Sequence, residues 1–257
     1  MTTIVVKIGG KAAESREGMD ALCQEILSLA RDNRFVLVHG GGAEVSALSR
    51  RLGVEPVFQD GVRQTSEQEM DIVDMVLAGK VNKQVVRLLR ARGLDAVGLS
   101  GSDGGIFTGR PVAGPAGSRS RTGEVTAVDA RLLTLLLDNG FLPVLSSSSM
   151  DGTGSGLNIN ADAAAFAVAS RLAASALVFL SDIPGILSDG SVIQAVSAAE
   201  AKELVAKGVV TGGMIPKVTA ALTAMDGGVG KVIIGQYEGA GSLGRLLEGK
   251  QGTRLWK

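Results

Sequence analysis

The chain has one cysteine, Cys23, and one histidine, His39, among its 257 residues. A single cysteine cannot form an internal disulfide, and neither a Cys-x-x-Cys pair nor a zinc-ligand spacing is present. A mechanism that needs a histidine base could use only His39. These scarcities argue against disulfide-stabilised folds, zinc sites and histidine-based hydrolysis.

An excess of charge of one sign is also absent, because 26 basic residues balance 26 acidic ones. The chain therefore shows no electrostatic sign of a nucleic-acid or anionic-membrane partner. No stretch at the N-terminus has the basic, apolar and cleavage regions of a signal peptide, and no run of 18 apolar residues is free of charge. We predict a cytoplasmic protein with neither nucleic acid nor membrane as partner.

Short apolar, β-branched runs alternate with stretches whose apolar residues recur every three or four positions. The predicted strands are residues 3–8, 35–38, 96–99, 141–145, 176–180 and 231–234. The predicted helices are residues 16–31, 43–52, 66–92 (two pieces broken near Gly79, with a capping box of Ser66 and Glu69), 129–139, 160–174, 198–207 and 215–225. Residues 109–123, rich in Gly, Pro, Ser and Arg, predict a hairpin or an exposed loop. This alternation is typical of an α/β domain with a parallel sheet.

Glycine is abundant, with 36 residues, and it gathers where predicted strands end. Gly9-Gly10 and Gly40-Gly41-Gly42 follow the first two strands, and Ser181-Asp182 follows a later one. Ligands of open parallel sheets bind beyond the carboxyl ends of the strands, where glycine lets backbone N–H groups converge on an anion. Tight turns alone would explain any one cluster. Two clusters, one of them preceded by Lys7, favour an anion site.

Several familiar anion motifs are excluded. No glycine-lysine pair continues as a Walker motif, and neither glycine turn matches the dinucleotide fingerprint. The His-Gly-Gly-Gly string would suit an esterase oxyanion hole, but the nearest nucleophile elbow, at 98–102, fails at its last position.

Two further segments carry polar groups in suggestive places. Asn160 is a good N-cap for the Ala-rich helix that follows, and Asp162 would stand in its first turn. Capping does not explain Asn158. Lys217 would stand in the first turn of another helix, an unfavourable place for a cation unless it faces a phosphate.

Taken together, six segments resemble the amino-acid kinase superfamily and, within it, the N-acetyl-L-glutamate kinases. They are V-V-K-I-G-G at 5–10, V-H-G-G-G at 38–42, G-V-R-Q-T at 61–65, N-I-N-A-D at 158–162, L-S-D-I-P-G-I at 180–186 and G-G-M-I-P-K at 212–217. The resemblance runs essentially end to end and includes M-V-L-x-G-x-V-N-K at 75–83 and a terminal G-T-R.

The resemblance implies an α/β fold, a three-layer αβα sandwich with a mainly parallel central sheet and two lobes. Residues 1–257 would form one such domain, with 1–173 binding the acyl amino acid and dimerising, and 174–257 binding the nucleotide. The implied reaction moves the γ-phosphoryl group of ATP to the side-chain carboxylate of N-acetylglutamate, in arginine synthesis. The implied cofactors are ATP and Mg²⁺, with Mg²⁺ held mainly by phosphates rather than by protein ligands. The apolar stretch from Met70 to Val86 would be either a dimer face or core.

The family pattern also assigns roles to residues. Lys7 and Lys217 would stabilise the transferring phosphoryl group, and Asp162 would keep both lysines aligned. Arg63 would clamp the α-carboxylate of the substrate in bidentate fashion. The remaining substrate-binding residues would be Gly41, Gly42, Asn158 and Asn160. The nucleotide-binding residues would be Gly9, Gly10, Ser181, Asp182, Gly185, Thr211 and Met214.

The chain departs from the family pattern on the substrate side, at Gln64, Ser66, Ser102 and the serine run 146–149. Two alternatives therefore stay open: a kinase of aminoadipate or glutamate linked to an acidic carrier protein, and a non-catalytic ligand sensor. The Ser-Arg-Ser-Arg string at 118–121 would be a solvated loop or a contact for such a carrier. Because the first strand begins at residue 3, without the N-terminal helix of arginine-inhibited hexamers, we expect a homodimer insensitive to arginine.

Overall fold

The computed structural model describes residues 1–9, 15–59, 61–114, 119–188, 190–210 and 214–257. They form two compact units: the first joins Met1–Leu37 to Ala165–Lys257, and the second is Val38–Ala164. The predicted lobes were residues 1–173 and 174–257, whereas the structure groups the first 37 residues with the C-terminal part. The functions assigned to the lobes stay predictions.

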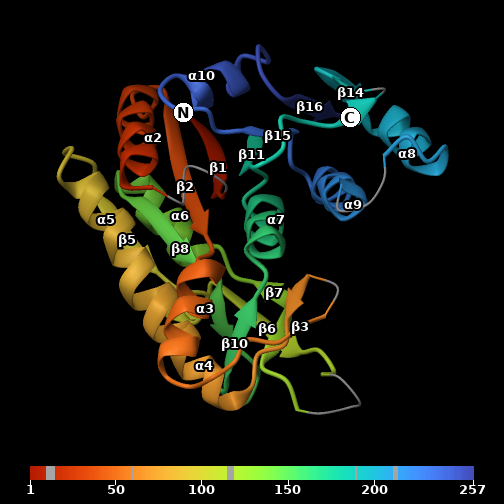
Figure 1. Ribbon diagram of the computed structural model, residues 1–257. Coiled ribbons are helices and arrows are strands. Elements are labelled where there is room, and N and C mark those ends of the chain that lie inside the picture. Colours follow the sequence, from red (N-terminus) through yellow and green to blue (C-terminus); the bar gives the residue numbers. More distant parts are fainter. Residues whose placement is uncertain (10–14, 60, 115–118, 189, 211–213) are drawn as a thin grey trace. The chain divides into compact units, whose positions relative to one another are not determined.

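The first unit is built on a mainly parallel sheet whose strands lie in the order β14-β16-β15-β11-β1-β2 (Figure 1). Their bounds are Ala195–Ser197, Thr253–Trp256, Lys231–Gln236, Ala176–Ser181, Thr2–Ile8 and Asn33–His39, the last two residues of β2 belonging to the second unit. β11 pairs in parallel with β1 and β15, while β16 runs antiparallel to β15. All of β11 is buried, which explains its nearly continuous apolar sequence.

Helices cover both faces of this sheet, α2 and α10 on one side and α7 and α9 on the other (Figure 1). The helices that belong wholly or mostly to this unit are α2 (Arg16–Leu29), α7 (Ala161–Arg171), α8 (Ala198–Ala206), α9 (Met214–Asp226) and α10 (Ser242–Leu247). The carboxylate of Glu25 in α2 accepts hydrogen bonds from Tyr237 Oη (2.8 Å) and Gly244 N (3.2 Å). On the other face, the ring of Phe166 lies 4.6 Å from that of Phe179 in β11. A hairpin of β12 (Leu187–Ser188) and β13 (Ser191–Val192) completes the unit.

The second unit holds a parallel pair, β8 (Leu142–Ser146) with β5 (Ala96–Leu99), and a four-stranded sheet in the order β6-β7-β10-β9. The strands of that sheet are Phe107–Pro111, Thr122–Val128, Gly156–Ile159 and Ser148–Met150. β3 (Phe58–Gln59) and β4 (Val62–Arg63) form a small hairpin. The helices are α3 (Gly42–Arg51), α4 (Glu67–Asp74), the π-helix η1 (Met75–Val81), α5 (Asn82–Arg90), the 3₁₀ turn η2 (Asp103–Gly105) and α6 (Arg131–Asp138). The α/β class with a mainly parallel central sheet is confirmed, and β6 and β7 form the hairpin predicted near 109–123.

The predicted break near Gly79 is wrong. α4, the π-helix and α5 follow one another without interruption, and the junction residues Met75 and Val81 keep right-handed helical dihedral angles. A π-helical hydrogen bond spans one more residue than an α-helical one, so the chain changes register there without leaving the helix.

The capping box predicted for α4 is half formed. Ser66 Oγ accepts the N–H of Glu69 at 3.1 Å, as expected. The Glu69 side chain bonds instead to Arg63 (2.7 Å) and Ser49 (3.3 Å), because it is buried and must satisfy a charged partner. A complete box caps α8, where Ser197 and Glu200 satisfy each other's backbone N–H groups.

The apolar stretch offered as a dimer face is largely core. Ile72, Val73 and Val76 are buried in a cluster with Val45, while Met75 is 55% exposed. Within the described parts of the chain, no helix has both the length and the apolar character needed to cross a bilayer.

Candidate functional site

Lys7 lies at the carboxyl end of β1, where its register partner is Phe179 of β11. A Cβ added to Gly9 would lie 2.6 Å from Lys7 Nζ and 2.8 Å from the carbonyl oxygen of Leu180. The ammonium group therefore folds back over Gly9, beside the end of β11. Glycine suits this position because a Cβ would collide with the backbone carbonyl of Leu180 and displace the Lys7 ammonium group.

Lys217 reaches the same strand end from the first turn of α9. Its Nζ donates a hydrogen bond to Ser181 Oγ at 2.8 Å, and Ser181 directly follows Leu180. Lys7 and Lys217 are far apart in sequence, yet their ammonium groups lie near two successive residues, Leu180 and Ser181, at the carboxyl end of the central parallel strand β11. The helix that carries Lys217 presents its positive end there, so the local field favours an anion.

The other nucleotide residues predicted in this unit occupy the turn after β11 and the start of α9. Asp182 is exposed, Met214 is half-buried, and Gly185 approaches Thr253 so closely that an added Cβ would lie 2.7 Å from Thr253 Oγ1. Gly10 and Thr211 lie outside the described residues.

Thr253 is a residue that sequence reasoning missed, although it stands in the terminal Gly-Thr-Arg. Its fully buried hydroxyl accepts from Ile186 N at 2.8 Å and donates to the carbonyl of Ile193 at 2.5 Å. It therefore fixes the end of the turn that begins with Ser181. A threonine at the edge of a short strand gives no sequence signal of such a role.

In the second unit Arg63 is buried, and both of its Nη groups donate hydrogen bonds. Nη1 donates to Glu69 Oε1 (2.7 Å), and Nη2 donates to the carbonyl of Gly42 (2.8 Å) and to Ser46 Oγ (2.5 Å). The guanidinium carbon also lies 4.8 Å from the centroid of the Phe58 ring. An end-on clamp of a carboxylate would require the Nη2 bonds to be exchanged, so the predicted clamp stays a prediction. The bond from Nη2 to the carbonyl of Gly42 also connects Arg63 to the glycine turn.

Asn158 and Asn160 are held by different partners. Asn158 Nδ2 donates to Thr65 Oγ1 at 2.8 Å, which joins β10 to the segment after Arg63. Asn160 Oδ1 accepts the N–H of Asp162 (2.8 Å) and of Ala163 (3.3 Å), so it caps α7 as predicted. Its predicted contact with substrate is not tested by this geometry.

The turn Gly40–Gly42 follows β2 and begins α3. Gly41 has φ = +152°, and a Cβ added to it would lie 2.8 Å from Leu77 Cδ2. Gly42 is the first residue of α3, and N–H groups in the first turn of a helix have no partner within that helix. These N–H groups are the ones that an anion would bind, and the anion site predicted at this turn stays a prediction.

Comparisons with known proteins identify the family of the chain. Residues 2–236 match the Amino acid kinase family. The chain belongs to the amino acid kinase family. Among its relatives, an acetylglutamate kinase of Geobacillus kaustophilus is 41% identical, over 90% of this chain and 89% of the relative. One of Chloroflexus aurantiacus is 43% identical, over 91% of this chain and 92% of the relative.

Solved structures carry the same fold. An N-acetylglutamate synthase of Neisseria gonorrhoeae, determined with coenzyme A and N-acetyl-glutamate, matches with a TM-score of 0.86 and 28% identity. The match covers all of this chain but only 59% of that one. A carbamate kinase of Giardia lamblia bound to AMP-PNP matches over 98% of its length with a TM-score of 0.73, and at 17% identity it bears on the fold alone.

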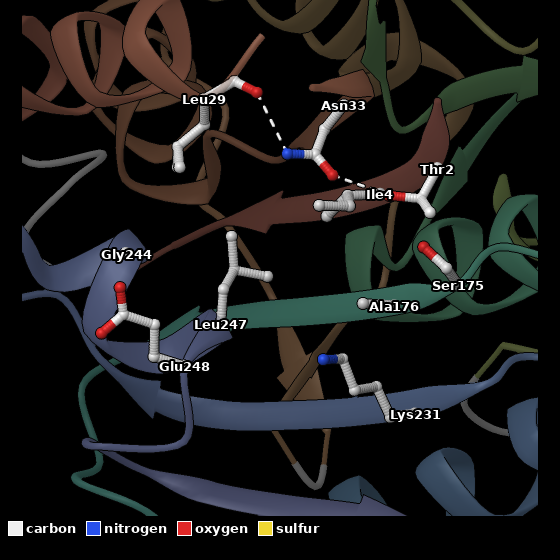
Figure 2. A pocket seen from close by; sticks show the side chains of 10 residues that line it. All are labelled: Thr2, Ile4, Leu29, Asn33, Ser175, Ala176, Lys231, Gly244, Leu247 and Glu248. Atoms are coloured by element: carbon white, nitrogen blue, oxygen red, sulfur yellow. Dashed lines mark hydrogen bonds between the residues drawn. The ribbon is translucent and has the colours of Figure 1, made fainter. Parts of the chain in front are cut away.

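The first unit of this amino acid kinase has a cavity of about 380 Å³, which neither Lys7 nor Lys217 lines (Figure 2). It opens at the amino ends of β1, β11 and β15, where Thr2, Ser175 and Lys231 line it. The predicted site lies at the opposite, carboxyl ends of these strands, and none of the cavity's lining residues was predicted as a site residue.

The basic string at 118–121 is not simply a solvated loop. Arg121 Nη2 donates to Asp151 Oδ2 (2.8 Å) and Arg121 Nε to the carbonyl of Gly156 (2.7 Å), with only 14% of the Arg121 side chain exposed. Hydrogen bonds from Thr153 and Arg121 hold the pKa of Asp151 well below its usual range. The Arg121 side chain is thus engaged in hydrogen bonds within the second unit. Ser118 lies outside the described residues.

Proposed function

We propose that this chain is an ATP-dependent kinase that phosphorylates the side-chain carboxylate of N-acetyl-L-glutamate. The product would be N-acetylglutamyl 5-phosphate, an acyl phosphate of arginine biosynthesis. The printed name of relatives 41–43% identical over most of the chain supports this acceptor. The observation that carries the proposal is the gathering of Lys7 and Lys217 at the end of β11.

The chemistry of phosphoryl transfer suits this site. A triphosphate and an ionised carboxylate repel each other, so catalysis consists mainly of positioning and of neutralising charge. In our proposal, Lys7 and Lys217 stabilise the charge on the transferring γ-phosphoryl group. The carboxylate is already ionised near neutral pH, so no general base is needed. The single histidine, buried and neutral, is consistent with that.

The other predicted residues keep their roles within the proposal. Gly41 and Gly42 would offer backbone N–H groups to the reacting carboxylate, and Asn158 would assist Arg63 at the α-carboxylate. Ser181, Asp182, Gly185 and Met214 would surround the nucleotide. Asp162 would align the lysines, and its Asn variant, predicted to lose most turnover while still binding nucleotide, tests that role.

Mg²⁺ would accompany the nucleotide in this proposal. Among the described residues there is no group of three or more His, Cys, Asp or Glu side chains that would hold a metal ion. Mg²⁺ keeps water and phosphate ligands readily, so in this proposal water and the bound nucleotide would supply most of its ligands. When bound, it would neutralise phosphate charge.

An ADP-release assay on four acceptors tests the function: N-acetylglutamate, free glutamate, N-acetyl-aminoadipate and a carrier-linked substrate. We expect turnover with N-acetylglutamate far above the others. Preference for the carrier-linked acceptor would instead support the lysine-type kinase, for which Arg121 is no longer available as a surface contact. Binding of N-acetylglutamate without any ADP release would support the non-catalytic sensor.

Assembly as a homodimer and a cytoplasmic location complete the proposal. Sedimentation velocity on the purified chain tests the first, and a monomer at micromolar concentration would contradict it. Fractionation of cells expressing the untagged chain tests the second.

A further inference from the structure

Each carbonyl of the glycine turn has a partner inside the second unit. Gly40 O accepts from His39 Nδ1 (2.8 Å), Gly41 O accepts from Val45 N (3.0 Å), and Gly42 O accepts from Arg63 Nη2 (2.8 Å). A trans peptide is planar, so its N–H points opposite to its C=O. Holding Gly40 O therefore sets the direction of the Gly41 N–H.

The bond to Gly40 O depends on the tautomer of His39. A neutral imidazole has one donor nitrogen and one acceptor nitrogen. Asn82 Nδ2 lies 3.0 Å from His39 Nε2 and supplies a donor there, which leaves Nδ1 to carry the hydrogen and donate to Gly40 O. Burial lowers the pKa of His39 to about 4, with the nearby ammonium of Lys83 acting in the same direction, so the ring is neutral at pH 7.

The orientation of the Asn82 amide is determined by two neighbours with fixed hydrogen-bonding roles. Lys83 Nζ can only donate, and it lies 2.9 Å from Asn82 Oδ1. The carbonyl of Val144 can only accept, and it lies 2.8 Å from Asn82 Nδ2. Because Asn82 is fully buried, an unmet amide would cost free energy, and the amide cannot turn without losing both bonds.

Asn82 also directly follows the π-helix, and side chains of the π-helix pack against the glycine turn. A Cβ on Gly41 would lie 2.8 Å from Leu77 Cδ2 and 3.1 Å from Val81 Cγ2. The same segment therefore touches Gly41 with its apolar side chains and reaches Gly40 through Asn82 and His39. π-helical turns often occur at functional sites, where an extra residue re-aims the side chains that follow.

We propose that Asn82 is a positioning residue for the reaction: it selects the Nδ1–H tautomer of His39 and thereby aims the Gly41 N–H at the reacting carboxylate. This inference rests on the proposed function, in which that N–H binds the carboxylate. Lys83 orients the Asn82 amide, and the π-helix supports the turn from its apolar side.

The first test observes the tautomer directly. His39 is the only histidine, so the untagged protein labelled with ¹⁵N-histidine gives one imidazole to assign. We expect the Nδ1–H form between pH 6 and 8 in the wild type and loss of that preference in Asn82→Leu. An Nε2–H wild type would overturn the proposal.

The second test is kinetic. Asn82→Leu should lower kcat with N-acetylglutamate by about 10- to 100-fold, the effect of misplacing a reacting group, with less than about a twofold change in the KM for ATP. Asn82→Asp places a carboxylate beside Nε2 and should raise the pKa of His39. The imidazolium keeps its Nδ1–H, so the kcat of this variant should fall as pH rises through that pKa, while the wild type stays level.

Lys80→Gln is the matched control, since Lys80 is an exposed π-helix residue paired with Glu44 on the surface; its kcat should equal that of the wild type. Folded Asn82 variants, judged by their thermal unfolding, that keep wild-type kcat at every pH would contradict the proposal. A wild type with the expected tautomer but no kinase activity would instead remove the proposed function and leave the link from Asn82 to Gly40 intact.

Discussion

At the scale of single residues, the lysine of α9 carries the sharpest prediction. In the proposed mechanism, replacing Lys217 by Met or Ala removes one of the two positive charges that would stabilise the transferring phosphoryl group, and we expect kcat to fall about 100- to 1,000-fold. Nucleotide binding, measured by calorimetry, should be retained. Lys202→Met, an exposed change on α8, serves as the control. Equal turnover in Lys217→Met and the wild type would remove this lysine from the reaction.

Arg63 and Glu69 make a buried ion pair, with side-chain exposures of 7% and 2%. Arg63→Met should destabilise the protein by about 3–5 kcal/mol, because Glu69 is left buried without its partner. Adding Glu69→Gln should recover much of that loss in denaturant unfolding. If the substrate clamp is also real, the double variant will stay stable but show a raised KM for N-acetylglutamate; an unchanged KM would limit Arg63 to a structural role.

His39 makes the free energy of unfolding depend on pH. Its pKa falls from about 6.5 in the unfolded chain to about 4 in the folded one, so the unfolded state binds more protons between these values. The contribution of His39 to stability is complete above pH 6.5 and lost as the pH falls toward 4, by about 3 kcal/mol in all. His39→Asn keeps a donor near Gly40 O and does not titrate. Denaturant unfolding from pH 4 to 7 should show a shallower slope in the variant; identical slopes would exclude His39 as the cause.

At the scale of elements, the π-helix invites a test by deletion. Removing Gly79 would let residues 67–90 become a regular α-helix, and one residue turns the helix by about 100°. Leu77 and Asn82 could then no longer both face the glycine turn. We expect kcat to be lost while helical circular dichroism is kept.

Gly79→Ala is the matched change at the same position. An added Cβ there meets only the Asp74 carbonyl, at 4.0 Å, so alanine should raise stability by up to about 1 kcal/mol and leave kcat unaltered. A deletion variant with full activity would show that the π-helical register is dispensable.

The elements also show where sequence patterns are informative. Apolar runs and capping residues predicted β11 and the start of α7, because burial and the unmet N–H groups of a helix act locally. The continuation of the helix through Gly79 and the pairing of Glu69 with Arg63 depend on neighbours distant in sequence. The same holds for Thr253, whose partners are some sixty residues away. Lys7 and Lys217 were assigned through resemblance, since spacing alone could not bring them to one strand end.

At the scale of the whole molecule, the division into two units predicts where each substrate protects the backbone. Hydrogen exchange should slow at the end of β11 and the start of α9 when ADP binds, and at β4 and β10 when N-acetylglutamate binds. Lys217→Met should keep the first pattern. Protection by ADP confined to the second unit would contradict the assignment of the nucleotide to the first.

Because the chain is synthesised from its N-terminus, the division into two units affects how it folds during translation. The segment Val38–Ala164 is an insertion within the sequence of the other unit, and all of it emerges from the ribosome before β11, the parallel neighbour of β1. Val5 of β1 pairs with Leu177 of β11, so the edge of β1 that β11 covers stays unpaired until β11 emerges. Nascent chains arrested before β11 emerges should therefore engage chaperones through their first residues, even when the inserted unit has already folded.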